Sequence, residues 1–426
     1  MIKILKYGEI APEEIFARGE AVKDVSSIVS EIIQNVKTGG DNAVKAYTEK
    51  FDGAKLDSLA VSDEEINDAL KKVEPKFLRI LQQAAKNIRA FHEKQKRQGF
   101  SIKKSNGVIL GQKITPIEKV GIYVPGGTAA YPSTVLMDSI PAIIAGASEI
   151  IMTTPPDKNG KINPAILAAA SVAGVDKIYK VGGAQAIAAL AFGTESIPKV
   201  YKIVGPGNAF VAEAKRQVFG LVSIDMIAGP SEIMIVSDGK SNPTFVAADL
   251  LSQAEHDKMA SAVLITDSAN LALKVQAEIE KQIPLLKRRD IARVSIDDNG
   301  KIIVAKNLKQ AIEIANEIAP EHLELCVEEP FKYFEEVKNA GSVFLGRNCP
   351  EALGDYFAGP NHTLPTSGTA KFSSPLSVDD FIKKTQFTFY TEDALRKVAG
   401  KVSYFAKKEG LTAHAKSATI RSEKTK

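Results

Sequence analysis

The stretch VYKIVGPGNAFVAEAKRQVFG (200–220) combines a short β-type run, a Gly-Pro-Gly turn and a helical segment. A turn of this kind places backbone N–H groups at the start of a helix, where they can approach an anion such as a phosphate. The third glycine of a GxGxxG fingerprint is missing, and Asp225, about twenty residues further on, is an uncertain partner for a ribose. Nucleotide contact and a plain strand-to-helix turn therefore both remain open for this stretch.

Three more β-type runs lie upstream, and each stops at a loop rich in glycine or proline. They are VGIYVPGG (120–127), EIIMTTPP (149–156) and KIYKVGGAQ (177–185). Alanine-rich helical stretches separate them, and strands that alternate with helices in this way predict βαβ units around a parallel sheet. Ligands of such sheets gather beyond the carboxyl ends of the strands, which makes these loops candidates for nucleotide contact.

The alternation resumes after residue 229, whereas residues 24–97 have apolar side chains at the three-and-four spacing of helices. The later β-type runs are IMIVSD (233–238), AVLIT (262–266) and ARVSID (292–297). Helices separate these runs as well. Residues 339–378 are rich in Gly, Pro and Ser and predict a loop, and a last amphipathic helix ends at Gly410 before a tail.

Composition favours a small-molecule ligand. Of the 426 residues, 44% are hydrophobic and 25% are charged, and the net charge is +4 with no basic stripe. Cys326 and Cys349 form no CxxC motif, the N-terminus reaches acidic residues too soon for a secretory signal, and the most apolar region, 133–152, is interrupted by charges and a proline. We therefore predict a cytoplasmic protein with no membrane span and no nucleic-acid partner.

The chain has only five histidines, and His256 stands three residues after Gln253 in a predicted helix. This spacing puts both side chains on one helix face, where they could bind a metal ion. Zinc usually takes Cys, His and carboxylate ligands, so a Gln is unusual, and a polar pair at a helix end is the alternative. GDYFAGPNH (354–362) offers Asp355 and His362 in a loop rich in glycine.

APEHLEL (319–325) places Glu321 beside His322 in a predicted loop between a helix and a strand. An imidazole titrates near neutrality and can exchange protons with an alcohol, and a neighbouring carboxylate can activate water. Adjacent residues need not face the same way, so the pair is a hypothesis. Glu409 and His414 follow a helix end, where a histidine is usually solvated, and we interpret His92 as a surface residue.

Together these motifs resemble the histidinol dehydrogenase family, in family order from about residue 24 to 422. The likeness rests on GIYVPGGTAAYPSTVLM, GGAQAIAALAFGTESIP, VGPGN, AGPSE, DLLSQAEHD, APEHLEL, GDYFAGPNHTLPTSGTAKFSS and EGLTAH. The resemblance implies an α/β fold of two incomplete Rossmann-like domains with small N- and C-terminal arms. The expected boundaries are an N-terminal arm at 1–22, a discontinuous domain with metal and acid–base residues at 23–121 and 230–374, an inserted NAD-contacting domain at 122–229, and a C-terminal helical arm at 375–426.

The resemblance further implies an NAD-dependent enzyme with one zinc ion per subunit, which oxidises L-histidinol to L-histidine through bound L-histidinal. Similar proteins catalyse the last step of histidine biosynthesis as homodimers whose C-terminal tail completes the partner's site. The implied zinc ligands are Gln253, His256, Asp355 and His414; the acid–base residues are Glu321 and His322; the NAD contacts are Tyr123, Gln185 and Asn208; the substrate contacts are Ser231, Glu409, His322 and the zinc ligands.

Two other functions compete with this interpretation. A zinc hydrolase could use the same ligands with Glu321 as its base, although it would not need the VGGAQ and VGPGN loops. A catalytically retired relative could bind zinc or ligand for regulation, although every expected catalytic position is filled. Formation of NADH from histidinol would distinguish the three.

Overall fold

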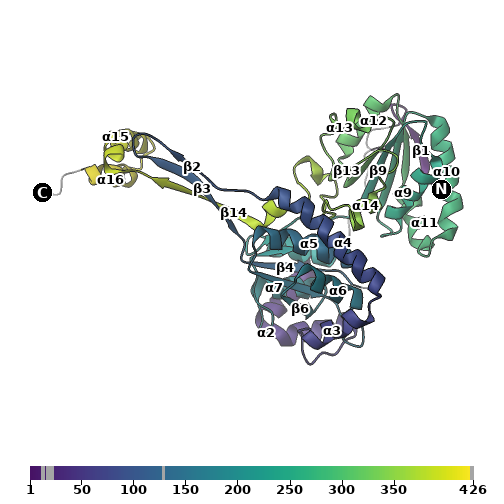
Figure 1. Ribbon diagram of the computed structural model, residues 1–426, viewed down its shortest axis with the longest axis horizontal. Helices are drawn as coiled ribbons and strands as arrows, with labels where there is room; N and C mark the ends of the chain where they lie inside the picture. Colours follow the sequence, from purple (N-terminus) through teal and green to yellow (C-terminus); the bar gives the residue numbers. More distant parts are fainter. Residues whose placement is uncertain (11–14, 16–23, 127–129, 423–426) are drawn as a thin grey trace. The chain divides into compact units, whose positions relative to one another are not determined.

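The computed structural model describes residues 1–10, 15, 24–126 and 130–422 (Figure 1). The chain divides into two compact units, the first made of residues 1–95 and 118–381 and the second of 96–117 and 382–426. Among the described helices, none is long and apolar enough to cross a membrane.

A five-stranded parallel sheet forms in the middle of the chain, as the sequence predicts, with the strand order β6-β5-β4-β7-β8. Helices link successive strands and cover the sheet (Figure 1). The strands are β4 (Lys119–Tyr123), β5 (Glu149–Thr154), β6 (Lys177–Lys180), β7 (Lys202–Val204) and β8 (Ser223–Ile224), and the helices are α5 (Pro132–Ala145), α6 (Pro164–Ala173), α7 (Gly183–Phe192) and α8 (Ala209–Val218).

A second parallel sheet has six strands in the order β1-β11-β10-β9-β12-β13. Its strands are β1 (Lys3–Lys6), β9 (Glu232–Ser237), β10 (Ser261–Thr266), β11 (Lys301–Val304), β12 (His322–Cys326) and β13 (Ser342–Leu345). Its helices are α9 (Pro243–Ala254), α10 (Ala269–Gln282), α11 (Arg289–Asp298), α12 (Leu308–Ile318), α13 (Pro330–Phe334) and α14 (Glu351–Tyr356).

Apart from the added strand β1, the two sheets have the same topology. In each, the first strand is central, the next two follow on one side, and the last two lie on the other side. This order, 3-2-1-4-5, is that of a doubly wound dinucleotide-binding fold without its sixth strand. The predicted α/β class with two incomplete Rossmann-like domains is therefore confirmed.

The helices before the first sheet pack differently from the expected boundaries, which grouped residues 23–121 with 230–374. Helices α2 (Ser26–Asp52), α3 (Asp63–Lys72) and α4 (Pro75–His92) pack against helices of the five-stranded sheet. Val29, Ile32 and Val36 of α2 share one hydrophobic core with α7 and β7. Their spacing shows which face of the helix is buried, but not which sheet covers it.

Part of the predicted N-terminal arm, 1–22, belongs to a sheet. Residues Lys3–Lys6 form β1, an edge strand that pairs in parallel with β11. Residues 11–14 and 16–22 of this predicted arm lie outside the described residues. The functional division of the chain into domains stays a prediction.

Three local predictions were wrong. ARVSID (292–297) lies in helix α11, where Ala292, Ser295 and Ile296 are buried at helical spacing, and the strand is the following segment, β11. The predicted loop 339–378 contains β13 and α14. His92 is buried and bonds through Nδ1 to Gln95 Oε1 at 2.7 Å.

The second unit contains an antiparallel sheet in the order β14-β3-β2, followed by two helices. The predicted tail after Gly410 contains a helix of its own. The elements are β2 (Phe100–Lys103), β3 (Ile109–Pro116), β14 (Ile382–Phe389), α15 (Glu392–Lys408) and α16 (Thr412–Thr419).

The packing of α2 predicts the outcome of a matched pair of substitutions. Ile32 is 3% exposed, so the change Ile32→Ala should create a buried cavity and destabilise the protein by about 2–5 kcal/mol. Ile28, on the same helix and 50% exposed, should change stability by less than about 0.5 kcal/mol. Urea unfolding measures both, and equal effects would contradict this packing.

Candidate functional site

The predicted acid–base pair lies at the amino edge of the six-stranded sheet. Glu321 directly precedes β12, His322 is its first residue, and Ser231 directly precedes the neighbouring strand β9. Side chains alternate along a strand, so His322, Glu324 and Cys326 share one face of β12. His322 was predicted in a loop; it lies in a strand whose pairing fixes its position.

The backbone of Glu232 holds both members of the pair. Its N–H donates to Glu321 Oε2 at 2.8 Å, and its carbonyl oxygen accepts from His322 Nδ1 at 3.0 Å. Because Nδ1 carries the proton of that bond, the lone pair of a neutral His322 is on Nε2. The two side chains are therefore fixed to one backbone residue and buried together.

Nε2 of His322 faces two carboxyl groups of α14. It lies 3.6 Å from Asp355 Oδ1 and 4.0 Å from Glu351 Oε1, both longer than a direct hydrogen bond. One ligand atom from each of the three residues lies within 4.8 Å of the others, and all three are buried. The group could hold a metal ion. Asp355 was predicted in a loop but is on a helix.

Burial and charge set the protonation of this group. Burial disfavours the imidazolium, but the negative charges of Glu321 and Asp355 outweigh it, and the pKa of His322 is well above its ordinary value. Burial also acts on Asp355, yet the neighbouring His322 and His362 hold the pKa of its carboxyl well below its usual range. Burial, and then the charge of Asp355, raise the pKa of Glu351 to about 8.

A further buried acid, Glu324, supports α14, and sequence reasoning missed it. Glu324 Oε1 accepts from the N–H of Glu351 at 2.7 Å, and Ser252 Oγ donates to Glu351 Oε2 at 2.9 Å. Burial and the charge of Asp249 raise the pKa of Glu324 well above its usual range. The alternation in HLELC (322–326) was the available signal, because it places Glu324 on the face of His322.

Gln253 and His256 lie at the end of α9, but not on one helical face. The helix ends at Ala254, and His256 follows in a turn whose N–H donates to the carbonyl oxygen of Gln253 at 3.1 Å. The Gln253 side chain is buried, and its Oε1 has no hydrogen-bond partner among the described residues. A buried amide oxygen without a donor fits a cation ligand.

The segment that follows α14 is attached to α5. His362 lies between Asp355 O, 3.1 Å from its Nδ1, and Thr134 Oγ1, 3.3 Å from its Nε2. Thr363 Oγ1 donates to Asp138 Oδ1 at 2.7 Å, in the next turn of α5. These bonds join the two sheets of the first unit beside the acid–base pair.

The predicted NAD contacts lie at the carboxyl edge of the five-stranded sheet. Tyr123 ends β4, Gln185 lies in the first turn of α7, and Asn208 caps α8 through bonds from Phe210 N and Val211 N. Tyr123 Oη accepts from the N–H of Gly183 at 3.1 Å. Gln185 is buried, and in the described chain its Oε1 has no hydrogen-bond partner.

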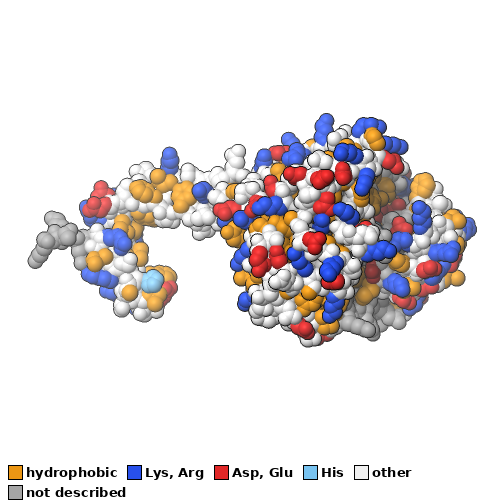
Figure 2. Space-filling model, turned by 90° about the horizontal axis from the view of Figure 1, so that it is seen from below, with side chains coloured by type: hydrophobic (Ala, Val, Ile, Leu, Met, Phe, Trp, Pro, Cys, Tyr) orange, Lys and Arg blue, Asp and Glu red, His pale blue; other side chains and the backbone are white. Residues whose placement is uncertain are grey.

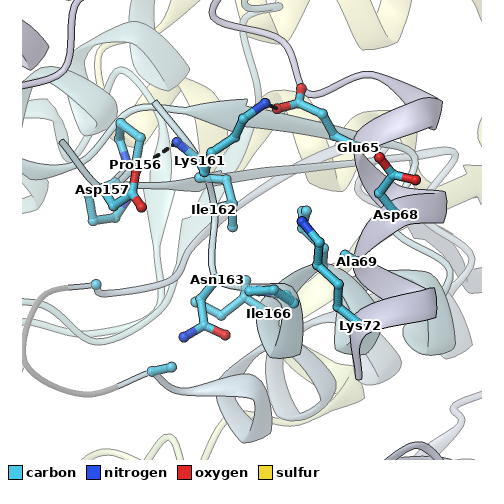
Figure 3. A pocket seen from close by; sticks show the side chains of 15 residues that line it. Glu65, Asp68, Ala69, Lys72, Pro156, Asp157, Lys161, Ile162, Asn163 and Ile166 are labelled. Atoms are coloured by element: carbon cyan, nitrogen blue, oxygen red, sulfur yellow. Dashed lines mark hydrogen bonds and ion pairs between the residues drawn. The ribbon is translucent and has the colours of Figure 1, made fainter. Parts of the chain in front are cut away.

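A cavity of about 450 Å³ lies at the same edge, beyond the ends of β4 and β5 (Figure 3). The close-up shows charged groups of both signs around it, and Lys161 Nζ lies 3.3 Å from Glu65 Oε1. A polar cavity at the end of the second strand of a doubly wound sheet is where adenosine groups are commonly held. Its charged and polar lining is Glu65, Asp68, Lys72, Asp157, Lys161 and Asn163.

The remaining two predicted residues belong to the second unit. Glu409 caps the end of α15 and His414 lies in the first turn of α16, and both are exposed. The first unit thus brings together Ser231, Gln253, His256, Glu321, His322 and Asp355 at one sheet edge or the helices that end there. Glu409 and His414 are not part of that arrangement within the first unit.

The fold and this site define the class of protein: an α/β enzyme with a buried histidine–carboxylate centre that could hold a metal ion. Residues 17–422 match the sequence profile of the family described as Histidinol dehydrogenase. The histidinol dehydrogenase of Clostridium acetobutylicum is 54% identical, over 99% of both chains, and that of Listeria monocytogenes serovar 1/2a is 59% identical over 94% of this chain and 93% of its own.

A crystal structure of histidinol dehydrogenase from Elizabethkingia anophelis superposes with a TM-score of 0.94 at 40% identity, covering 99% of this chain and 98% of that one. The chain belongs to the histidinol dehydrogenase family and is an oxidoreductase of histidine biosynthesis.

The ligand set is testable through metal-dependent stability. An ion bound to the folded state at 100 times its Kd stabilises it by about 2.7 kcal/mol, so Zn²⁺ should raise the Tm of chelator-treated protein. Gln253→Leu and Asp355→Asn should abolish this rise, whereas Asp257→Asn, on the exposed turn beside His256, should keep it. A full rise in Gln253→Leu would exclude Gln253 as a ligand and favour His322, Glu351 and Asp355.

Proposed function

We propose that this chain oxidises L-histidinol to L-histidine in two hydride transfers to NAD, through L-histidinal that stays bound, with one zinc ion per subunit. The observation that carries the proposal is the pair of hydrogen bonds at the Glu232 backbone, one donated by its N–H and one accepted by its carbonyl oxygen, which fix Glu321 and His322 side by side. An alcohol oxidation followed by hydration of an aldehyde needs a base and a water-activating carboxylate in one place.

Zinc fits the side chains of the first unit. Gln253, His256 and Asp355 would hold it, with His414 as a fourth ligand, and the orphaned oxygen of Gln253 supports this assignment. When bound, zinc orients the substrate's nitrogens and polarises its hydroxyl as a Lewis acid. Four protein ligands usually make a closed site, so this function requires the coordination to expand for substrate.

His322 supplies the base of the first step. Nδ1–H is bonded to the carbonyl oxygen of Glu232, so Nε2 is the atom that takes the proton of the substrate hydroxyl. At the same time a hydride leaves the carbon that bears this hydroxyl and passes to NAD. His322 must be neutral to accept a proton, but the neighbouring carboxylates raise its pKa and so favour the charged imidazolium. A cation held by Asp355 would offset those charges and favour the neutral imidazole.

Glu321 supplies the base of the second step. Its Oε2 is held by the N–H of Glu232, and the carboxylate takes a proton from the water that adds to the aldehyde carbon. The hydrate then loses a second hydride to a second NAD and becomes the acid. Two NAD are reduced and one water is consumed for each alcohol. Ser231, at the same sheet edge, would contact the substrate.

The carboxyl edge of the five-stranded sheet suits NAD. Tyr123, Gln185 and Asn208 lie there, and the orphaned Oε1 of the buried Gln185 is an acceptor available to a coenzyme hydroxyl or amide. The charged cavity at the end of β5 would take the adenosine half. When bound, NAD supplies the hydride acceptor for both steps.

The second unit supports a homodimer in which Glu409 and His414 complete the partner's site. Large apolar side chains are exposed on this unit, and Figure 2 shows apolar groups on its surface. Exposed apolar surface of this extent is typical of a subunit interface. The members with the largest exposed areas on strands and helices are Phe100, Ile102, Phe389, Tyr404 and Phe405. A cytoplasmic location is proposed from the free cysteines alone.

Product stoichiometry tests the two-step function. Chelator-treated protein given Zn²⁺ should form about two NADH per L-histidinol consumed, since both oxidations occur before release. Glu321→Gln should form only about one NADH per L-histidinol, because the aldehyde is then hydrated slowly. His322→Ala should be almost inactive. Folded, zinc-loaded wild type that forms no NADH would refute the function and favour a hydrolase or a retired relative.

Subunit exchange tests the shared site. His322→Ala and His414→Ala should each be inactive, but a heterodimer of the two has one intact site if the tail acts in the partner. An equal mixture refolded or co-expressed together should therefore recover about a quarter of wild-type activity, from half the dimers with one site each. A mixture that stays inactive, although heterodimers are recovered by two successive affinity tags, one on each variant, would place His414 in its own subunit's site.

A further inference from the structure

The GPGN turn at 205–208 is held by a buried ion pair. Gly205 N–H donates to Asp225 Oδ2 at 2.8 Å, and Gly205 O accepts from Lys215 Nζ at 2.9 Å. Lys215 also pairs with Asp225 Oδ1, and the two side chains are 2% and 1% exposed. Asp225, considered above as a ribose partner, is therefore occupied inside the protein.

The turn has little freedom to rearrange. Gly205 has φ +117°, and a Cβ on it would lie 2.1 Å from the carbonyl oxygen of Tyr123. Both of its backbone hydrogen-bonding groups are bound to the same pair of side chains. The pair therefore fixes the turn that leads into Asn208, the proposed NAD contact.

Asp138 lies on the other side of the same turn. Its Oδ2 would be 3.2 Å from a Cβ on Gly205, and its Oδ1 accepts from Thr363. Burial, and also the charge of Asp225, raise the pKa of Asp138 to about 8, although Lys215 opposes this. At neutral pH Asp138 is therefore a neutral acid, for which Asn is a close replacement.

Thr363 belongs to a segment that begins near the proposed metal ligand Asp355. Asn361 Nδ2 donates to Met137 O at 2.6 Å and His362 bonds to Thr134, so three successive residues are attached to one face of α5. Asp138 thus lies between the coenzyme turn on one side and the segment beside the acid–base pair on the other.

We propose that Asp138, Lys215 and Asp225 are positioning residues, which hold the coenzyme turn at a fixed place relative to the substrate side of the site. Lys215 and Asp225 set the turn itself, and Asp138 with Thr363 sets its relation to the 361–363 segment. The inference rests on the proposed function. Hydride transfer depends steeply on the distance between donor and acceptor carbons. A coenzyme turn that is no longer held in place would therefore lower the rate, although no group that touches substrate is removed.

The test separates binding from turnover. Lys215→Met/Asp225→Asn, which leaves no unpaired buried charge, should raise the Kd of NAD, measured by titration without substrate, about tenfold. Zinc content and histidinol affinity should stay unchanged. Thr363→Val and Asp138→Leu should lower kcat about a hundredfold with little change in either affinity, and Asp138→Asn should restore most of it.

Lys202→Met is the matched control, because Lys202 is a buried lysine of the same sheet at the opposite end of β7. It should leave the NAD Kd and kcat as in the wild type. If Lys202→Met has the same effect as the double variant, or if Asp138→Asn is no better than Asp138→Leu at equal Tm, the positioning role is overturned. Wild-type protein that neither binds NAD nor forms NADH would overturn the proposed function, and the positioning role with it.

Discussion

The pairing of β12 with β9 is the constraint on which the acid–base site depends. Parallel pairing sets His322 opposite Ile233, and this register brings the Glu232 peptide beside residues 321 and 322. The N–H of Glu232 then donates to Glu321, and its carbonyl oxygen accepts from His322. A one-residue shift of the register would turn every side chain of β12 to the opposite face, so the pair is held by the whole sheet and not by a loop.

The two sheets share one topology, but the residues proposed for the reaction lie at opposite edges of them. The residues proposed for NAD follow the carboxyl ends of strands, as is usual for doubly wound folds. The residues proposed for acid–base chemistry lie at the amino ends of strands. Helix α9 ends at the same edge after crossing the sheet, which places Gln253 there. The segment 361–363 joins these two regions through α5. A reaction between a coenzyme and a metal-bound substrate can use both edges only if such a link fixes them.

Much of the fold could be predicted from the sequence, because strands and helices follow hydrophobic period and Gly or Pro boundaries. ARVSID was misread because its apolar residues fit a two-residue and a three-to-four-residue period over so short a run. The sheet that α2 covers was not predictable, since an amphipathic helix does not specify its partner. Gln253, Glu321 and Asp355 were candidates from their local sequence, and the family resemblance supplied their roles. Burial of Glu324 and the pairing of Lys215 with Asp225 follow from tertiary contacts.

The carboxyl groups around His322 explain why a cation suits this centre. Asp249, Glu324 and Glu351 relieve the cost of burial by holding protons more tightly, as their raised pKa values show. Asp355 stays ionised, so it supplies the negative charge that a metal ion needs. In the proposed function the other ligands would bind as neutral groups, and a divalent ion held by one carboxylate would keep a net positive charge. That charge would make it easier for a substrate hydroxyl to lose its proton to His322.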